Sequence, residues 1–240
     1  MTSFKIGQRV IGPDAPPFVI AEMSGNHNQS LEVALQIVDA AAKAGAHALK
    51  LQTYTADTMT LDLAEGEFFI KDPGSLWAGS SLYELYEKAH TPWEWHAPIF
   101  ARAKALGMLA FSTPFDETAV DFLESLDVPA YKIASFENTD LPLIRRVAAT
   151  GKPLIISTGM ASVAELDETV RAARADRKSV VSGLAAQQPY PHHCPSAAVV
   201  RLPGRVVRSL HGCGGRGGSG GLGCDRGGET FHPGSCCRWC

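Results

Sequence analysis

The chain has 240 residues, of which 45% are hydrophobic and 20% charged, so it can build one large domain or two small domains with a buried core. The formal net charge of −3, with no long basic run before the C-terminal tail, argues against nucleic acid or an anionic membrane as partner. The first ten residues lack the apolar core of a signal peptide, and no stretch approaches the roughly 18 apolar residues of a membrane span, so we expect a cytoplasmic protein that acts on small molecules.

Short apolar strands alternate with amphipathic helices along most of the chain. The first unit is a buried strand over 18–23, followed by a helix that Ser30 caps and that ends near Gly45. Further strands are predicted over 47–53, 108–113, 129–135 and 153–158, and further helices over 114–126, 140–149 and 162–175. A long aromatic-rich insertion with its own helix separates the second strand from the third. This alternation predicts an α/β fold of five parallel βα units, covered on both faces or closed into a barrel.

Each predicted strand ends in polar residues. They are Glu22, Asn26 and His27 after the first strand, then Lys50, Gln52 and Tyr54, then Ser112 and Thr113, then Lys132 and Ser135, and finally Ser157 and Thr158. Because the carboxyl ends of parallel strands face one mouth, these groups should converge. The pattern therefore predicts an active site at this end of the sheet.

Two lysines lie inside otherwise apolar strands, in the strings LKL and YKI. Burying an unpaired ammonium group is costly, so Lys50 and Lys132 each need an anion. A phosphate or carboxylate ligand among the hydroxyl groups of the strand ends would supply it. The alternative is an internal ion pair with Glu22 or Glu137.

The loop and insertion residues have simpler explanations as well. His27 can be a solvated or capping residue, and Asn26 can accommodate a left-handed turn beside Gly25. The aromatic residues of LYELYEKAHTPWEW have helical spacing, which favours packing over a ligand site.

Five strings in order, IAEMSGNHN, LKLQTY, FSTPFDETAVDFLE, YKIASFE and KPLIISTGM, resemble the sialic acid synthases from about residue 16 to about residue 175. Within that family, YTADTMTLD and YELYEKAHTPWEWH look most like the pseudaminic acid synthases. The resemblance implies an enzyme that condenses phosphoenolpyruvate with 2,4-diacetamido-2,4,6-trideoxy-altrose to give pseudaminic acid and phosphate. An N-acetylneuraminate or legionaminate synthase is the alternative. The implied fold is the N-terminal five βα units of a TIM (β/α)8 barrel, incomplete, over residues 1–177.

The resemblance also assigns roles to the strand-end residues. Glu22 would be catalytic, at the reacting centre. Phosphoenolpyruvate would be bound by Lys50, Thr113, Lys132, Ser135, Ser157 and Thr158, and the aminosugar by Asn26, His27, Gln52 and Tyr54. The family further implies a divalent cation, Mn²⁺ or Mg²⁺, and a homodimer in which a C-terminal antifreeze-like domain reaches the partner's site.

The sequence departs from the family after about residue 177. The two histidine motifs that bind the cation in the family, Ser-Asp-His-Thr and Glu-Lys-His-Phe-Thr-Leu, do not occur, so we predict no metal ligand in this chain. Residues 178–240 are a Gly- and Cys-rich tail that we expect to be disordered. A one-nucleotide shift of the frame encoding 228–233 permits Glu-Lys-His-Phe-Thr-Leu, which suggests a frameshifted end. An incomplete barrel exposes strand edges and should have impaired activity.

Two rival interpretations remain. In the first, the chain is an inactive fragment whose tail cysteines bind zinc, although the spacing lacks the double CxxC…CxxC pattern. In the second, it is another enzyme that condenses phosphoenolpyruvate with an aldehyde. Such an enzyme would share the lysines but not the GNHN and YELYEKAH strings.

Overall fold

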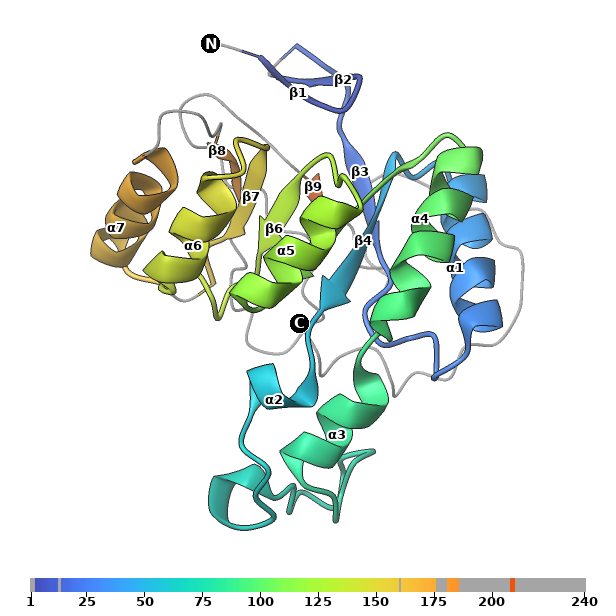
Figure 1. Ribbon diagram of the computed structural model, residues 1–240, viewed down its shortest axis with the longest axis vertical. Coiled ribbons are helices and arrows are strands. Elements are labelled where there is room, and N and C mark those ends of the chain that lie inside the picture. Colours follow the sequence, from blue (N-terminus) through green and yellow to red (C-terminus); the bar gives the residue numbers. More distant parts are fainter. Residues whose placement is uncertain (1–2, 13, 160, 176–180, 186–207, 210–240) are drawn as a thin grey trace, which may run out of the picture.

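The computed structural model describes residues 3–12, 14–159, 161–175, 181–185 and 208–209. The predictions of a disordered tail, a frameshifted end and a cysteine zinc site lie outside the described residues. Figure 1 shows a central sheet with helices packed on it and a small hairpin at one end.

A parallel sheet of seven strands forms the centre of the described fold, in the order β8-β7-β6-β5-β4-β3-β9. The strands are β3 (Val19–Glu22), β4 (Ala48–Thr53), β5 (Leu109–Pro114), β6 (Tyr131–Ile133) and β7 (Leu154–Ser157), with β8 (Val181–Ala185) and β9 (Arg208–Ser209) at the edges. The prediction of an α/β fold with five consecutive parallel βα units is confirmed. The two edge strands were not predicted from the sequence.

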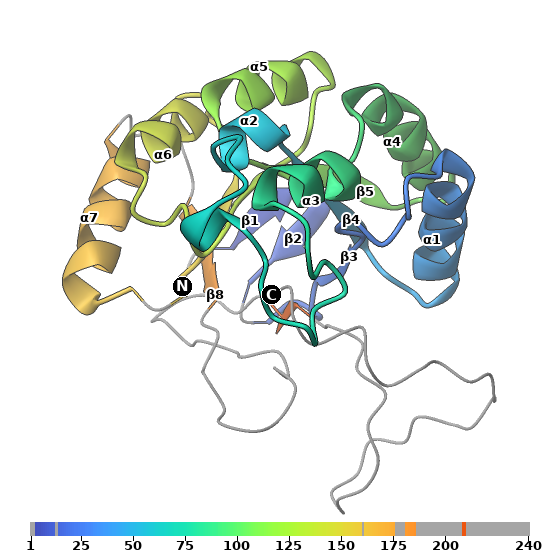
Figure 2. The ribbon, with the colours of Figure 1, turned by 90° about the horizontal axis from the view of Figure 1, so that it is seen from below.

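Helices cover the outer side of the sheet, which curls into a half-barrel (Figure 2). They are α1 (Leu31–Lys43), α4 (His96–Ala105), α5 (Glu117–Ser125), α6 (Leu141–Ala148) and α7 (Val163–Arg174). Side chains fix where they begin: Ser30 accepts from the backbone of α1, and Ser162 forms a capping box with Glu165. The helix predicted from residue 114 begins later, because Asp116 caps it by accepting from the Ala119 amide at 2.7 Å.

Two apolar clusters hold the helices on the sheet. One includes Leu123 and Ile144 of α5 and α6 together with residues of the strands, and it extends to Phe4 and Ile11 of the hairpin. The other lies between β3, β4 and helices α1 and α4, and includes Leu49 and Ile99. Full burial of one such side chain stabilises the fold by about 1.5–3 kcal/mol, so these clusters dominate its stability.

Opposite ends of the sheet carry different additions (Figure 1). The antiparallel hairpin of β1 (Phe4–Ile6) and β2 (Arg9–Ile11) lies at the amino ends of the strands. The insertion after β4 lies beyond the carboxyl ends, where Figures 1 and 2 both place α2 (Ala56–Met59) and α3 (Leu82–Ala89). The 3-10 turns η1 (Gly66–Phe68) and η2 (Trp93–Trp95) complete this connection.

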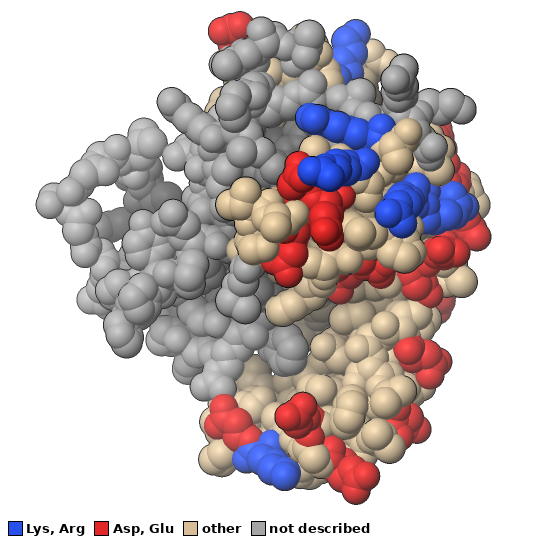
Figure 3. All heavy atoms as spheres, turned by 90° about the vertical axis from the view of Figure 1, so that its left-hand side faces the viewer, with Lys and Arg blue, Asp and Glu red and all other residues tan. Residues whose placement is uncertain are grey.

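The described surface mixes both signs of charge. On the face shown in Figure 3, Lys and Arg side chains lie among Asp and Glu side chains, without a broad basic area on that face. Ion pairs of the described surface include Arg146 with Asp121 and Arg171 with Asp167. None of the helices in the described segments has the length and apolar character needed to cross a bilayer.

Candidate active site

Glu22, Lys50 and Thr113 come together from three neighbouring strands. Glu22 and Lys50 are paired in register on β3 and β4. The Lys50 ammonium forms an ion pair with the Glu22 carboxylate and makes a long hydrogen bond to the Thr113 hydroxyl, at 3.4 Å. The two charged side chains are only 9% and 18% exposed. The internal ion pair that the sequence left open for Lys50 is therefore present, and it places a carboxylate at the strand ends.

Lys132 differs from Lys50 because it makes no ion pair within the described part of the chain. Its ammonium group donates to the Ser157 hydroxyl and to the Ile133 carbonyl oxygen, at 2.9 Å for the latter. Burial, reinforced by the neighbouring charge of Lys50, lowers the pKa of Lys132 to about 7. A cation whose hydrogen-bond acceptors are neutral is suited to receive an anionic ligand.

Hydrogen bonds join the segments that follow β6 and β7. The Asn138 amide donates to the Thr158 carbonyl oxygen at 2.7 Å, and the Thr169 hydroxyl donates to the Asn138 carbonyl oxygen. Gly159 has φ +51°, and a Cβ there would lie 2.8 Å from the Cβ of Ser135. Asn138 and Gly159 were not predicted as site residues, although they lie in or beside the strings YKIASFE and IISTGM.

Glu137 lies at the carboxyl end of β6, and one of its carboxyl oxygens has no hydrogen-bond partner within the described residues. Its Oε2 atom is buried and has no hydrogen bond within the described residues. Burial raises the pKa of Glu137, while the charge of Lys132 opposes that change. The proposed ion pair of Glu137 with a strand lysine is not formed, so the sequence-based alternative holds for Glu22 and fails for Glu137.

The GNHN loop after β3 contains several left-handed residues, but Asn26 is not one of them. The positive φ angles of this loop belong to Ser24, Asn28 and Gln29, at 49°, 49° and 54°. Asn26 is exposed, and its side-chain amide donates to the Met23 carbonyl oxygen at 2.8 Å. The suggestion that Asn26 accommodates the left-handed turn is therefore wrong. Its exposed side chain lies in the loop that leaves the carboxyl end of β3.

His27 is completely buried. Its Nδ1 atom accepts from the Gln29 amide at 3.2 Å, and its Nε2 atom lies 3.0 Å from the Thr91 hydroxyl. The ring packs edge-on against Trp95, with ring centroids 5.4 Å apart. Burial lowers the pKa of His27, so the neutral ring is favoured. Both ring nitrogens are thus used within the protein.

Tyr54 is also buried, between the strand end and the insertion. Its ring makes edge contacts with Tyr86, His90 and Phe115, at centroid distances of 5.8, 6.5 and 5.4 Å. Burial raises the pKa of Tyr54, which keeps the phenol neutral. Gln52 remains partly exposed on β4, in register with Thr113. Of the four residues expected on the aminosugar side, Asn26 and Gln52 are accessible, while His27 and Tyr54 pack against the insertion.

A buried polar network supports the ends of β4 and β5 and was not found from the sequence. The Thr53 hydroxyl lies 2.8 Å from Nε2 of His96 and 2.6 Å from the Ser112 hydroxyl. Nδ1 of His96 lies 3.3 Å from the Pro92 carbonyl oxygen, so it donates there and Nε2 accepts from Thr53. Burial lowers the pKa of His96 to about 4. A histidine at a helix start gives no sequence signal for such a contact.

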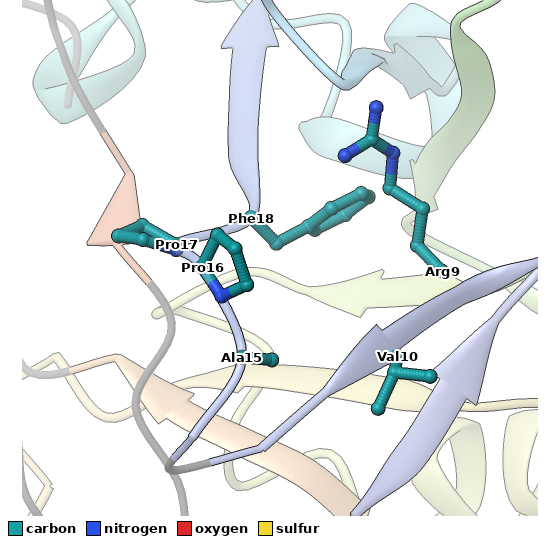
Figure 4. A pocket seen from close by; sticks show the side chains of 6 residues that line it. All are labelled: Arg9, Val10, Ala15, Pro16, Pro17 and Phe18. Atoms are coloured by element: carbon teal, nitrogen blue, oxygen red, sulfur yellow. The ribbon is translucent and has the colours of Figure 1, made fainter.

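The described residues contain no group of three or more His, Cys, Asp or Glu side chains arranged to hold a metal ion. The cation implied by the resemblance therefore finds no ligand set in this part of the chain. A pocket of about 210 Å³ does exist, but at the amino end of β3, as Figure 4 shows. It is lined by Arg9, Val10, Ala15, Pro16, Pro17 and Phe18.

The match to known families agrees with this arrangement. The NeuB family model matches residues 37–203. The chain belongs to the NeuB family. The match continues past residue 177, where the resemblance predicted from the sequence ends.

Curated relatives of this NeuB-family chain include pseudaminic acid synthases from Helicobacter pylori and Campylobacter jejuni. The one from Helicobacter pylori is 43% identical over 187 residues, covering 78% of this chain and 54% of the relative. The one from Campylobacter jejuni serotype O:2 is 52% identical over 153 residues, covering 64% of this chain and 44% of the relative. The chain thus spans about half the length of the curated relatives it matches. The predicted resemblance is confirmed at the level of the family.

Solved structures confirm the barrel type of the fold. The sialic acid synthetase from Leptospira borgpetersenii, in complex with citrate, superimposes with a TM-score of 0.67 at 26% identity, covering 80% of this chain and 62% of that one. The spore coat polysaccharide biosynthesis protein SpsE from Bacillus subtilis gives 0.61 at 34% identity, covering 79% and 50%. A DAHP synthase from Thermotoga maritima gives 0.54 at 13% identity, covering 82% and 49%, and shows the fold alone.

Proposed function

We propose that this chain binds phosphoenolpyruvate at the strand ends and condenses it with an N-acetylated aminosugar. The aminosugar we propose is 2,4-diacetamido-2,4,6-trideoxy-altrose, which would give pseudaminic acid and phosphate. The observation that carries the proposal is that Lys50 and Lys132 each bond a strand-end hydroxyl group and are near enough for the charge of Lys50 to act on Lys132, which has no carboxylate partner in the described region. The names of the relatives from Helicobacter pylori and Campylobacter jejuni support the choice of product.

Phosphoenolpyruvate carries a phosphate and a carboxylate, which match the two lysines. Lys50 and Lys132 hold these groups, and hydroxyl groups from the same strand ends donate to them. The hydroxyl donors are Thr113, Ser135, Ser157 and Thr158. Lysine suits this task as a compact point charge, while the fixed hydroxyl groups orient the ligand. Burial and the charge of Lys50 lower the pKa of Lys132 in the free chain, and a bound anion would offset the repulsion between the two ammonium groups.

The reaction makes one carbon–carbon bond and breaks one carbon–oxygen bond. C3 of phosphoenolpyruvate attacks the aldehyde carbon of the open-chain sugar, and the aldehyde oxygen takes up a proton. Water then adds to the cationic C2 with loss of a proton. The C2 hydroxyl group next gives its proton to the departing phosphate as the bond from C2 to the phosphate oxygen breaks, which leaves a carbonyl at C2. Because C3 is a weak nucleophile, holding it against the aldehyde supplies much of the acceleration. The lysines stabilise the charge on the departing phosphate.

Glu22 is the candidate catalytic residue. Its carboxylate is fixed by the ion pair with Lys50, at the end of β3. From there it orients the aldehyde or carries the proton exchanged in the reaction. On the aminosugar side, Asn26 and Gln52 are the candidates for direct contact, while His27 and Tyr54 hold the surrounding structure. The two family histidine motifs are missing from the sequence, so we expect turnover below that of the longer relatives.

The test combines a binding measurement with product analysis. Phosphoenolpyruvate is titrated into the chain by calorimetry, and product is sought by mass spectrometry with the altrose derivative, N-acetylmannosamine and the legionaminate precursor. We expect the Lys132→Met variant to lose at least about 100-fold in phosphoenolpyruvate affinity, because it removes a charge-assisted contact. Lys43→Met, on the exposed end of α1, is the matched control and should bind as the wild type does. Absence of phosphoenolpyruvate binding by the wild-type chain would refute the proposal, and product from another sugar would correct its substrate.

A further inference from the structure

The loop after β3 contacts the last turn of α3 and forms hydrogen bonds with it. The Gln29 side-chain amide donates to the carbonyl oxygens of Lys88 and His90, at 2.7 and 2.8 Å. A Cβ at Gly25 would lie 2.7 Å from the Ala89 carbonyl oxygen, so the loop backbone passes directly against the helix. The last carbonyl groups of a helix have no partner within the helix, and here the loop supplies one. Helix α3 is therefore held by the segment that follows Glu22.

His27 lies at the centre of this contact, and its hydrogen bonds define its tautomer. Nδ1 accepts from the Gln29 amide, so in the neutral ring the proton is on Nε2. Nε2 therefore donates to the Thr91 hydroxyl, 3.0 Å away and 64 residues further along the chain. The ring has no exposed surface, so water cannot replace either bond. Losing the Thr91 hydroxyl would leave a buried donor without a partner.

A second contact ties the same helix to the end of β4. Tyr86 and His90 pack edge-on against Tyr54, and the Trp93 indole donates to the Tyr54 carbonyl oxygen at 3.3 Å. Helix α3 is thus attached to the ends of both strands that carry the Glu22–Lys50 ion pair. Figures 1 and 2 show it lying across the carboxyl ends of the sheet.

We propose that His27 is a positioning residue: its hydrogen bond to Thr91 fixes α3 at the carboxyl ends of the strands. There α3 forms one wall of the aminosugar site. His27 itself does not contact the sugar. The proposal rests on the proposed function for the identity of the ligand. It does not depend on turnover, because the wall and the affinity for the sugar are both measurable without reaction. It assigns to His27 a role that its sequence motif alone does not reveal.

The test removes the hydroxyl group and keeps the shape of the side chain. Thr91→Val deletes the acceptor of the His27 donor, and Thr91→Ser is the matched control that retains it. Hydrogen exchange of the amides in α3 is measured without ligand, and the affinity for the altrose derivative is read from the protection that it gives to the same amides. Phosphoenolpyruvate affinity is measured in parallel.

In Thr91→Val we expect exchange in α3 to be about tenfold faster and the aminosugar to bind about tenfold more weakly, the effect of one unsatisfied buried donor. Phosphoenolpyruvate affinity should be unchanged, and Thr91→Ser should behave as the wild type. Unchanged hydrogen exchange in α3 or unchanged aminosugar affinity in Thr91→Val overturns the proposal. A loss of phosphoenolpyruvate affinity as large as the loss of aminosugar affinity also overturns it, because it would indicate general disruption of the site. A wild-type chain that binds phosphoenolpyruvate but no aminosugar also overturns it, while leaving the phosphoenolpyruvate site intact.

Discussion

Raising the pH above neutrality should weaken phosphoenolpyruvate binding by removing the charge on Lys132. Its ammonium group is held by the Ser157 hydroxyl and the Ile133 carbonyl oxygen, and it has no carboxylate partner among the described residues. Burial and the charge of Lys50 lower the pKa of Lys132 to about 7. The lysine therefore loses its proton in the free chain as the pH rises through 7, and anion binding must restore it.

The magnitude follows from the protonated fraction of the free chain. With a pKa of about 7 for Lys132, about one quarter of the chains carry the proton at pH 7.5 and about one hundredth at pH 9. If only the protonated form binds, affinity falls by about 25-fold between these two pH values. Phosphoenolpyruvate is fully ionised over this range, so its own titration does not contribute.

The assay is a calorimetric titration of phosphoenolpyruvate at both pH values, with Lys132→Arg as control. Arginine stays charged throughout, so the affinity of that variant should be nearly constant whatever its absolute value. Equal affinity of the wild-type chain at the two pH values would refute the reasoning, because Lys132 would then be protonated despite its burial. An equal fall in the arginine variant would assign the effect to another group.

Three further predictions concern the surroundings of the site. Gly159→Ala should weaken phosphoenolpyruvate binding and lower the melting temperature, because φ is +51° at this position and the new Cβ would lie 2.8 Å from the Cβ of Ser135. Calorimetry measures the affinity and thermal unfolding the melting temperature, and wild-type values in both would contradict the prediction. Leu123→Ala, in the core between α5 and the sheet, should lower the free energy of unfolding by about 3 kcal/mol in urea, and a loss under 1 kcal/mol would show a looser core. Burial lowers the pKa of His96 to about 4, so below pH 6.5 the unfolded chain binds a proton that the folded chain does not. We expect the free energy of unfolding to fall by about 2 kcal/mol between pH 7 and pH 5. A His96→Gln variant with the same pH dependence would contradict this.

The repeating part of the fold could be predicted because its signals are local. The continuous apolar strands and the capping residues Ser30 and Ser162 lie in the elements they define, and all five βα units were found. The start of α5 was placed too early because Asp116, rather than the proline before it, caps the helix. The edge strands β8 and β9 and the β1–β2 hairpin were not predicted, because they lie outside the repeating alternation of strands and helices.

The candidate site could be predicted in part for a similar reason. The rule that parallel strands end at one mouth brings Glu22, Lys50 and Thr113 together from sequence position alone. The burial of His27 and Tyr54 could not be predicted, because it depends on where the insertion helix packs. The bond from His27 to Thr91 joins residues 64 positions apart, and no local pattern specifies such a contact.

The most direct test of the central claim is a crystal structure of this chain with phosphoenolpyruvate. We predict that the ligand lies within hydrogen-bonding distance of both Lys50 and Lys132, with strand-end hydroxyl groups donating to it. Lys132 should then exchange its contact with the Ile133 carbonyl oxygen for the anion. Phosphoenolpyruvate bound away from both lysines, or absent from the strand ends at concentrations that saturate the chain in solution, would contradict the account.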